Sequence, residues 1–99
     1  MIPLFKVAMN PTADKAVGKV LSSGFIGQGE VVEKFELDLK ICFNNPYLVT
    51  VNSGTSALTL ALRIIKDKHP EKKYIISTPL TCTATNWAIL AAGFGIIWA

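Results

Sequence analysis

Residues 74–99, YIISTPLTCTATNWAILAAGFGIIWA, have the pattern of a strand, a helix and a second strand. YIIS (residues 74–77) and GIIWA (residues 95–99) are short apolar runs rich in β-branched side chains, which favour strands. The segment between them predicts a helix over residues 81–92, followed by Gly93, a residue type that commonly ends helices. Because strands that alternate with helices form parallel sheets with right-handed crossovers, this stretch predicts an α/β fold.

The same alternation begins further upstream. Residues 47–51 (YLVTV) are β-branched and aromatic and predict a first strand. The helix predicted to follow is apolar on nearly all sides over residues 57–65, which indicates burial on more than one side. Together these segments give the order β-α-β-α-β with a mainly parallel sheet.

Two helices are expected before this alternation. Apolar residues recur with helical spacing over residues 13–21, directly after the cap-forming residues 10–12 (NPT). A second amphipathic helix is predicted over residues 30–43. We therefore expect an N-terminal helical segment, residues 1–46, ahead of the start of a larger α/β domain, residues 47–99.

The composition is unusually apolar for a short chain. Of the 99 residues 51% are hydrophobic and only 17% are charged, and the mean hydropathy is +0.41. This excludes disorder. The longest uncharged apolar run, residues 88–99, is shorter than the roughly 18 to 20 residues of a membrane-spanning helix. Small domains need a polar surface, so we expect either an oligomer or a piece of a larger domain that exposes apolar sheet edges and faces.

Charge and cysteines point to no special partner. The net charge is +3, and the excess lies mainly in residues 63–73, where a solvated helix end explains it better than a nucleic-acid patch. Cys42 and Cys82 are far apart and lack a CxxC partner, so no metal site is expected. No leader sequence is apparent, and a cytoplasmic location with reduced thiols is the expectation.

The turn Asn52-Ser53-Gly54-Thr55-Ser56, at the start of the helix predicted over residues 57–65, is the best candidate site. A helix N-terminus presents free N–H groups and a positive dipole end, so it binds anions. Gly54 allows close approach of a ligand, and Thr55 and Ser56 add hydroxyl groups. The spacing matches neither a Walker P-loop nor a GxGxxG loop, and an ordinary Ser/Thr-capped helix start remains the alternative.

Two further segments are candidates. Residues 78–87 (TPLTCTATNW) form a polar rim at the carboxyl end of a predicted strand, where ligands collect in open α/β sheets, or else a polar first turn with Thr caps. Cys82 has weak support as a nucleophile because no base stands beside it in the sequence. Residues 22–29 (SSGFIGQG) could provide core side chains or a ligand-lining flap.

Four segments together resemble one family. They are IPLFK (residues 2–6), SSGFIGQGEVVEKFE (22–36), VTVNSGTSALTLALR (49–63) and STPLTCTATNWAILAAG (77–93). In this order they resemble the N-terminal part of the DegT/DnrJ/StrS-type sugar aminotransferases, which are fold type I enzymes dependent on pyridoxal 5′-phosphate (PLP). The resemblance implies that the chain is an incomplete, N-terminal portion of such an enzyme, the first part of the large domain preceded by two helices.

The resemblance also implies roles for particular residues. Gly54, Thr55 and Ser56 match the turn that grips the PLP phosphate. Cys82 stands where the family usually has an aromatic residue stacked on the pyridine ring, a departure from the pattern. Residues 24–29 match a segment that borders the active site near the subunit interface. The Schiff-base lysine and the aspartate that binds the pyridinium nitrogen come after residue 99, so these 99 residues supply no catalytic residue.

The function implied is transfer of an amino group from an amino acid, usually glutamate, to a keto group of a nucleotide-activated sugar. The full-length protein is expected to be a homodimer without nucleic-acid or membrane partners, and the fragment alone is expected to be inactive. Two alternatives stay open. One is a PLP-dependent sugar dehydratase of the same family, in which histidine replaces the lysine. The other is a stand-alone anion-binding or interaction module without catalysis.

Overall fold

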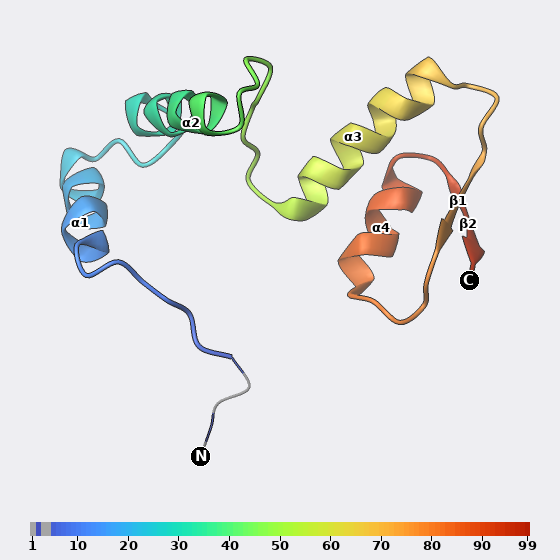
Figure 1. Ribbon diagram of the computed structural model, residues 1–99, viewed down its shortest axis with the longest axis horizontal. Helices are drawn as coiled ribbons and strands as arrows, with labels where there is room; N and C mark the ends of the chain where they lie inside the picture. Colours follow the sequence, from blue (N-terminus) through green and yellow to red (C-terminus); the bar gives the residue numbers. More distant parts are fainter. Residues whose placement is uncertain (1, 3–4) are drawn as a thin grey trace. The chain divides into compact units, whose positions relative to one another are not determined.

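A computed structural model describes residue 2 and residues 5–99 of the chain. Its helices and strands, in chain order, are α1 (Ala13–Ser23), α2 (Glu30–Cys42), α3 (Gly54–Lys68), β1 (Tyr74–Ser77), α4 (Thr83–Ala91) and β2 (Gly95–Trp98), as Figure 1 shows. The chain divides into two compact units, Met1–Leu48 and Val49–Ala99, and each is described by itself.

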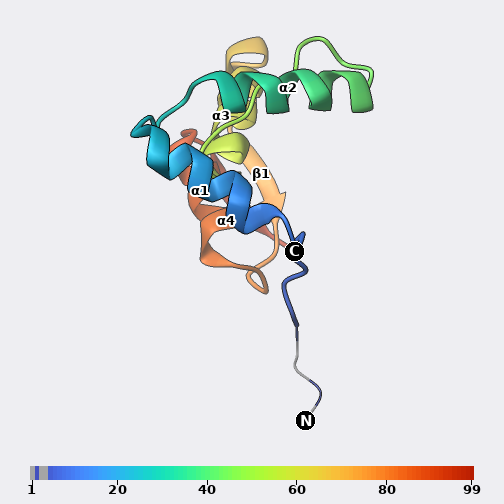
Figure 2. The same ribbon diagram turned by 90° about the vertical axis from the view of Figure 1, so that its left-hand side faces the viewer.

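The first unit consists of α1 and α2 with their flanking loops (Figure 2). Before α1, the side-chain oxygen Oδ1 of Asn10 accepts hydrogen bonds from the backbone N–H of Thr12 (2.9 Å) and from its hydroxyl (2.8 Å). α1 ends at Gly24, whose φ of 74° is left-handed and whose N–H donates to Leu21 O at 3.2 Å. Such an end suits glycine, which has no Cβ to clash in this conformation. Both helices predicted from the sequence are confirmed.

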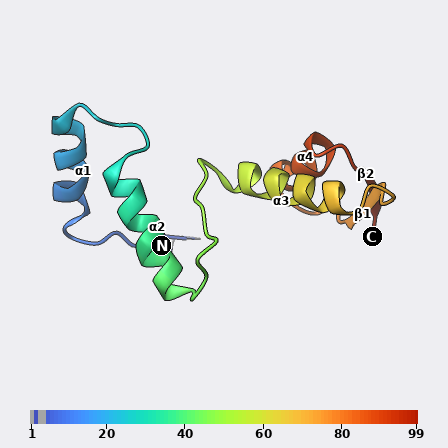
Figure 3. The same cartoon turned by 90° about the horizontal axis from the view of Figure 1, so that it is seen from above.

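The second unit contains a two-stranded parallel sheet. β1 and β2 pair in register from Tyr74 opposite Gly95 to Ser77 opposite Trp98. α4 provides the crossover between them, and it packs against both β2 and α3. Figure 3 shows this unit from above, with α3 and α4 beside the strands. The predicted α/β fold with parallel strands is confirmed.

The prediction of a strand over residues 47–51 is wrong. Tyr47 lies in a turn and residues 48–51 in loop, and Tyr47, Val49 and Val51 are exposed. The sheet of the described residues consists of β1 and β2 alone. A β-branched sequence favours extended backbone, but a strand exists only where neighbouring backbone provides a ladder of hydrogen bonds.

The start of α4 also differs from the helix predicted over residues 81–92, because Cys82, with φ −59° and ψ 133°, lies outside the helical region.

A small core holds the second unit together. Ile89, Ala92 and Phe94 are buried, and the partly buried side chains packed against them are Leu62, Ile75 and Ile96. Leu62 lies on α3, Ile75 on β1, Ile89 on α4 and Ile96 on β2, while Ala92 and Phe94 lie in the turn between α4 and β2. The cluster therefore joins every helix and strand of the unit.

Two basic side chains of α3 reach the carbonyl groups at the end of α4. Lys66 Nζ donates to Gly93 O and lies 5.1 Å from the centroid of the Phe94 ring. Arg63 Nη2 donates to Ala91 O at 3.4 Å. Cations are favoured at a helix C-terminus, where unpaired carbonyl groups carry partial negative charge. These contacts add to the apolar packing that holds α3 against α4.

Apolar side chains are exposed on the sheet face that turns away from the core. Tyr74, Ile76 and Ile97 are 64%, 71% and 50% exposed, whereas Ile75 and Ile96 point into the core from the opposite face. The expected exposure of apolar faces is thus confirmed.

The expectation that α3 is buried on more than one side is wrong for the described residues. On this helix Leu62 packs against the core, but four large apolar side chains are 43% to 49% exposed: Leu58, Leu60, Ile64 and Ile65. The reason is that α4 is the packing partner this helix finds in the second unit, and one partner covers one face.

Among the described residues, no helix has both the length and the apolar character to cross a membrane.

The two glycines with positive φ allow a matched test. A Cβ at Gly24 (φ +74°) would meet open space, whereas a Cβ at Gly93 (φ +82°) would lie 2.6 Å from Lys66 Nζ. Gly24→Ala should cost about 1 kcal/mol of local stability through backbone strain alone. Gly93→Ala should cost about 0.3 to 1 kcal/mol more, because the Lys66 ammonium, the mobile end of a flexible side chain, has to leave the carbonyl groups at the end of α4. Amide hydrogen exchange in the segments around each site measures both effects. Equal losses at the two positions would contradict the role given to Lys66.

Candidate functional site

The turn that opens α3 is held by hydrogen bonds among its own residues. Ser53 is the N-cap of the helix, and its side-chain oxygen accepts the backbone N–H of Ser56 at 3.1 Å. The hydroxyl of Ser56 donates to Asn52 Oδ1 at 2.8 Å and lies 2.9 Å from the hydroxyl oxygen of Ser53. Serine is among the preferred N-cap residues because it satisfies an otherwise unpaired amide in this way.

The first turn of α3 can bind an anion. The backbone amides of Gly54 and Thr55 have no acceptor inside the helix, since an α-helix leaves its first N–H groups without partners. The positive end of the helix dipole lies at the same place. Gly54 is exposed, and a Cβ built on it meets no atom within 4 Å. Thr55 and Ser56 are half-buried beside it. Gly54, Thr55 and Ser56, predicted from the sequence as a phosphate site, therefore form one continuous turn with open space above it.

Cys82 immediately precedes α4. The residue is exposed, and its backbone carbonyl accepts the N–H of Thr85 at 3.0 Å, while its side chain makes no capping hydrogen bond. Figure 1 shows α3 and α4 running in the same direction, with both N-termini at the end of the unit where β1 ends. Gly54, Thr55, Ser56 and Cys82 thus lie at the same end of the second unit. This is the end at which open α/β sheets bind their ligands.

Asn86 has a structural role in this region that the sequence did not reveal. Its Oδ1 accepts the Ser77 hydroxyl at 2.7 Å, and its Nδ2 donates to Thr78 O at 3.2 Å. The amide thereby joins α4 to the last residue of β1 and the first residue of the loop that carries Cys82. Asn86 is the one amide side chain among residues 78–87, and this is the signal that could have indicated its role.

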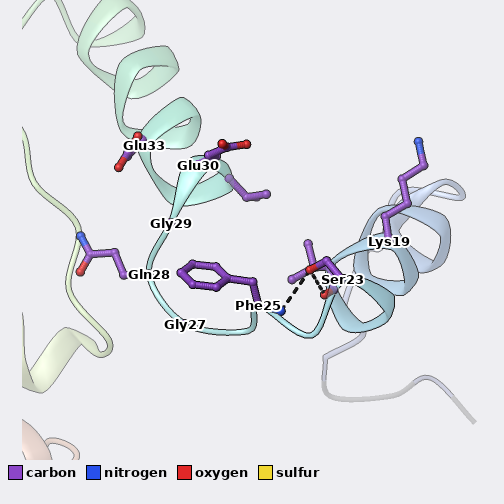
Figure 4. A pocket seen from close by; sticks show the side chains of 10 residues that line it. Lys19, Ser23, Phe25, Gly27, Gln28, Gly29, Glu30 and Glu33 are labelled. Atoms are coloured by element: carbon purple, nitrogen blue, oxygen red, sulfur yellow. Dashed lines mark hydrogen bonds between the residues drawn. The ribbon is translucent and has the colours of Figure 1, made fainter.

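The loop of residues 22–29 borders an open groove of about 670 Å³ in the first unit (Figure 4). Ser23 Oγ donates to Val20 O at 2.7 Å and accepts the N–H of Phe25 at 3.1 Å. The Phe25 ring lies so close to Gly29 that a Cβ there would be 2.5 Å from a ring carbon. The ring is nevertheless 66% exposed, so Phe25 is not a core residue of the first unit.

The residues at the start of α3 have the chemistry to hold the phosphate of PLP. Two unpaired amides, a threonine hydroxyl and a position with space for a close approach are the donors and the shape that a phosphate group requires. Among the described residues no cluster of three or more metal-binding side chains occurs, and Cys42 and Cys82 are free thiols.

The link made by Asn86 can be tested by substitution. Asn86→Ala should lower stability by about 1 to 2 kcal/mol, because the half-buried hydroxyl of Ser77 loses its acceptor. It should also increase amide exchange across residues 78–82. Ser77→Ala removes the donor of the same contact but leaves the bond from Asn86 Nδ2 to Thr78 O in place, so it should produce a smaller loss and leave exchange across residues 78–82 unchanged. An equal loss in the two variants would contradict a contribution from the Thr78 contact.

Two solved structures are similar to the whole chain. The crystal structure of AtS13 from Actinomadura melliaura superposes with a TM-score of 0.86 at 54% sequence identity, and the chain covers 26% of that protein. The crystal structure of the sugar aminotransferase CalS13 from Micromonospora echinospora gives a TM-score of 0.83 at 42% identity, with 27% of that protein covered. The chain therefore spans about a quarter of the length of these two relatives.

Sequence comparison agrees with the structural likeness. The spore coat polysaccharide biosynthesis protein SpsC of Bacillus subtilis (strain 168) is 35% identical over 77 residues, which are 78% of this chain and 19% of that protein. The model of the DegT/DnrJ/EryC1/StrS aminotransferase family matches residues 8–98. The resemblance found in the four sequence segments is confirmed. The chain belongs to the DegT/DnrJ/EryC1/StrS aminotransferase family.

Proposed function

We propose that the whole protein transfers an amino group from an amino acid, with glutamate as the donor, to a keto group of a nucleotide-activated sugar. Membership of the family supports an aminotransferase, and the printed description of CalS13 as a sugar aminotransferase supports a sugar substrate. The observation that carries the proposal for this chain is the first turn of α3, with its free amides beneath the open space at Gly54.

In this proposal the chain binds the cofactor but does not carry out the chemistry. Gly54, Thr55 and Ser56 hold the phosphate of PLP, and the helix dipole of α3 stabilises its charge. Cys82, at the same end of the unit, packs against the pyridine ring. PLP, when bound, supplies the electron sink that amino-group transfer requires. The lysine and the aspartate that complete the site come from the whole protein, beyond residue 99.

The division of the chain also stays part of the proposal. Residues 1–46 are the N-terminal helical segment, and residues 47–99 begin the large α/β domain. The whole protein acts as a homodimer without nucleic-acid or membrane partners. Its place is the cytoplasm, where exposed thiols such as Cys42 and Cys82 stay reduced.

The activity is tested with the whole protein, PLP, glutamate and a nucleotide-linked keto sugar. We expect an amino sugar nucleotide together with an equal amount of 2-oxoglutarate, both measured by mass spectrometry. A sugar that loses water without formation of 2-oxoglutarate would instead identify a dehydratase. The 99-residue chain alone is the control and should give neither product. An active 99-residue chain would contradict the assignment of the catalytic lysine to a later segment.

The role of Cys82 is tested by changing the area available for stacking. Cys82→Tyr should strengthen binding of PLP about two- to tenfold, because an aromatic ring stacks more broadly than a thiol. Cys82→Ala should weaken it. Each variant should change the affinity for pyridoxal, which has the same ring without the phosphate, by the same factor as it changes the affinity for PLP. Fluorescence titration measures the dissociation constants. Unchanged affinities in both variants would place Cys82 away from the ring.

A further inference from the structure

The buried side chains of α4 are gathered in the second half of the helix. They are Ala88 and Ile89, and the core continues from there into the turn before β2. Residues 83–87 form the first half of the helix, directly after Cys82, and none of them is buried. Apolar burial therefore secures the end of α4 that lies far from the candidate site, and the end beside Cys82 is held in another way.

Asn86 attaches this first half of α4 to the end of β1. Its Oδ1 accepts the Ser77 hydroxyl at 2.7 Å, and its Nδ2 donates to Thr78 O at 3.2 Å. A backbone carbonyl only accepts hydrogen bonds, so the contact with Thr78 fixes which way the amide points. Asn86 and Ser77 are both half-buried, which partly shields their hydrogen bond from water. The amide thus sets where α4 begins relative to the strand.

The loop between β1 and α4 is held at both of its ends by the first half of α4. At its start, Thr78 O accepts the Asn86 amide, while the Thr78 hydroxyl accepts the N–H of Leu80 at 3.2 Å. At its end, Cys82 O accepts the N–H of Thr85 at 3.0 Å. Cys82 is therefore fixed to the helix by its own carbonyl, and the helix is fixed to β1 by Asn86.

The first turn of α3 is held separately. Its hydrogen bonds join Asn52, Ser53 and Ser56 to one another, whereas those of Asn86 join α4 to β1 and the loop. A change at Asn86 therefore acts on the Cys82 side of the candidate site without breaking a bond on the α3 side.

We propose that Asn86 is a positioning residue for the pyridine ring of the cofactor, acting through the first half of α4 and Cys82. This inference rests on the proposed binding of PLP with its ring against Cys82. Attraction between packed atoms falls steeply with a gap of less than 1 Å, so a small displacement of the helix end weakens such a contact. The affinities for the ring and for the phosphate then depend on different residues.

Binding to the whole protein freed of cofactor tests this role, with PLP, pyridoxal and inorganic phosphate as probes. Asn86→Ala should weaken binding of PLP and of pyridoxal by the same factor, about three- to tenfold, because the ring loses part of its contact. The affinity for inorganic phosphate, measured by competition with PLP, should stay unchanged. Thr55→Val should give the reverse pattern, with weaker binding of PLP and phosphate and unchanged binding of pyridoxal.

A core variant separates positioning from a general loss of stability. Ile89→Val, in the same helix, removes one buried methyl group and destabilises the fold to a comparable extent, but it should leave the affinity for pyridoxal unchanged. Ser77→Ala removes one of the two bonds of Asn86 and should give the Asn86→Ala pattern with a smaller loss. Thermal denaturation of each variant reports folding.

A double-mutant cycle with Cys82 tests the route of the effect. Cys82→Tyr should gain less affinity for pyridoxal in the Asn86→Ala background than in the unaltered protein, because both residues act on one contact. An undiminished gain would overturn the inference, as would unchanged pyridoxal affinity in Asn86→Ala or an equal loss in Ile89→Val. Unchanged pyridoxal affinity in both Cys82→Tyr and Cys82→Ala would instead reject the proposed ring contact itself, which distinguishes the two failures.

Discussion

The packing of Phe94 against Ile89, Ala92 and their partly buried neighbours is the contact on which the second unit depends. Phe94 lies between the end of α4 and the start of β2, so its burial fixes where the crossover helix returns to the sheet. Lys66 covers the ring and binds the adjacent carbonyl of Gly93, which ties α3 to the same point. The candidate site lies at the other ends of these helices. Contacts at their C-terminal ends therefore help to place α3 and α4, while hydrogen bonds within the turn and those of Asn86 hold the site locally.

The core of the second unit is small, and much apolar surface remains outside it. The face of the sheet formed by Tyr74, Ile76 and Ile97 is exposed, although strands of parallel sheets are usually covered on both faces. The chain spans about a quarter of the length of AtS13 and CalS13. In the whole protein that we propose, further segments of the large domain cover this face. The apolar composition of the chain then reflects the interior of a larger domain.

Local patterns predicted the helices and two of the strands, because caps, apolar spacing and glycine stops act within a few residues. The strand expected over residues 47–51 failed since its formation depends on a neighbour, which a local pattern does not contain. The turn at Gly54 was also predicted, because the residues that form it are adjacent in the sequence. The hydrogen bonds from Ser77 to Asn86 and from Lys66 to Gly93 were not predicted. They join residues that are distant in the sequence and come together only when α4 crosses between the two strands.

Gly54 stabilises nothing in its own chain. It has helical backbone, its surroundings are open, and alanine would favour the helix more than glycine does. An alanine at this position would therefore leave the fold intact or strengthen it, while occupying the space that a ligand needs. In the phosphate site that we propose, glycine leaves space for the ligand at a small cost in helix stability, so folding and binding can be altered separately at this residue.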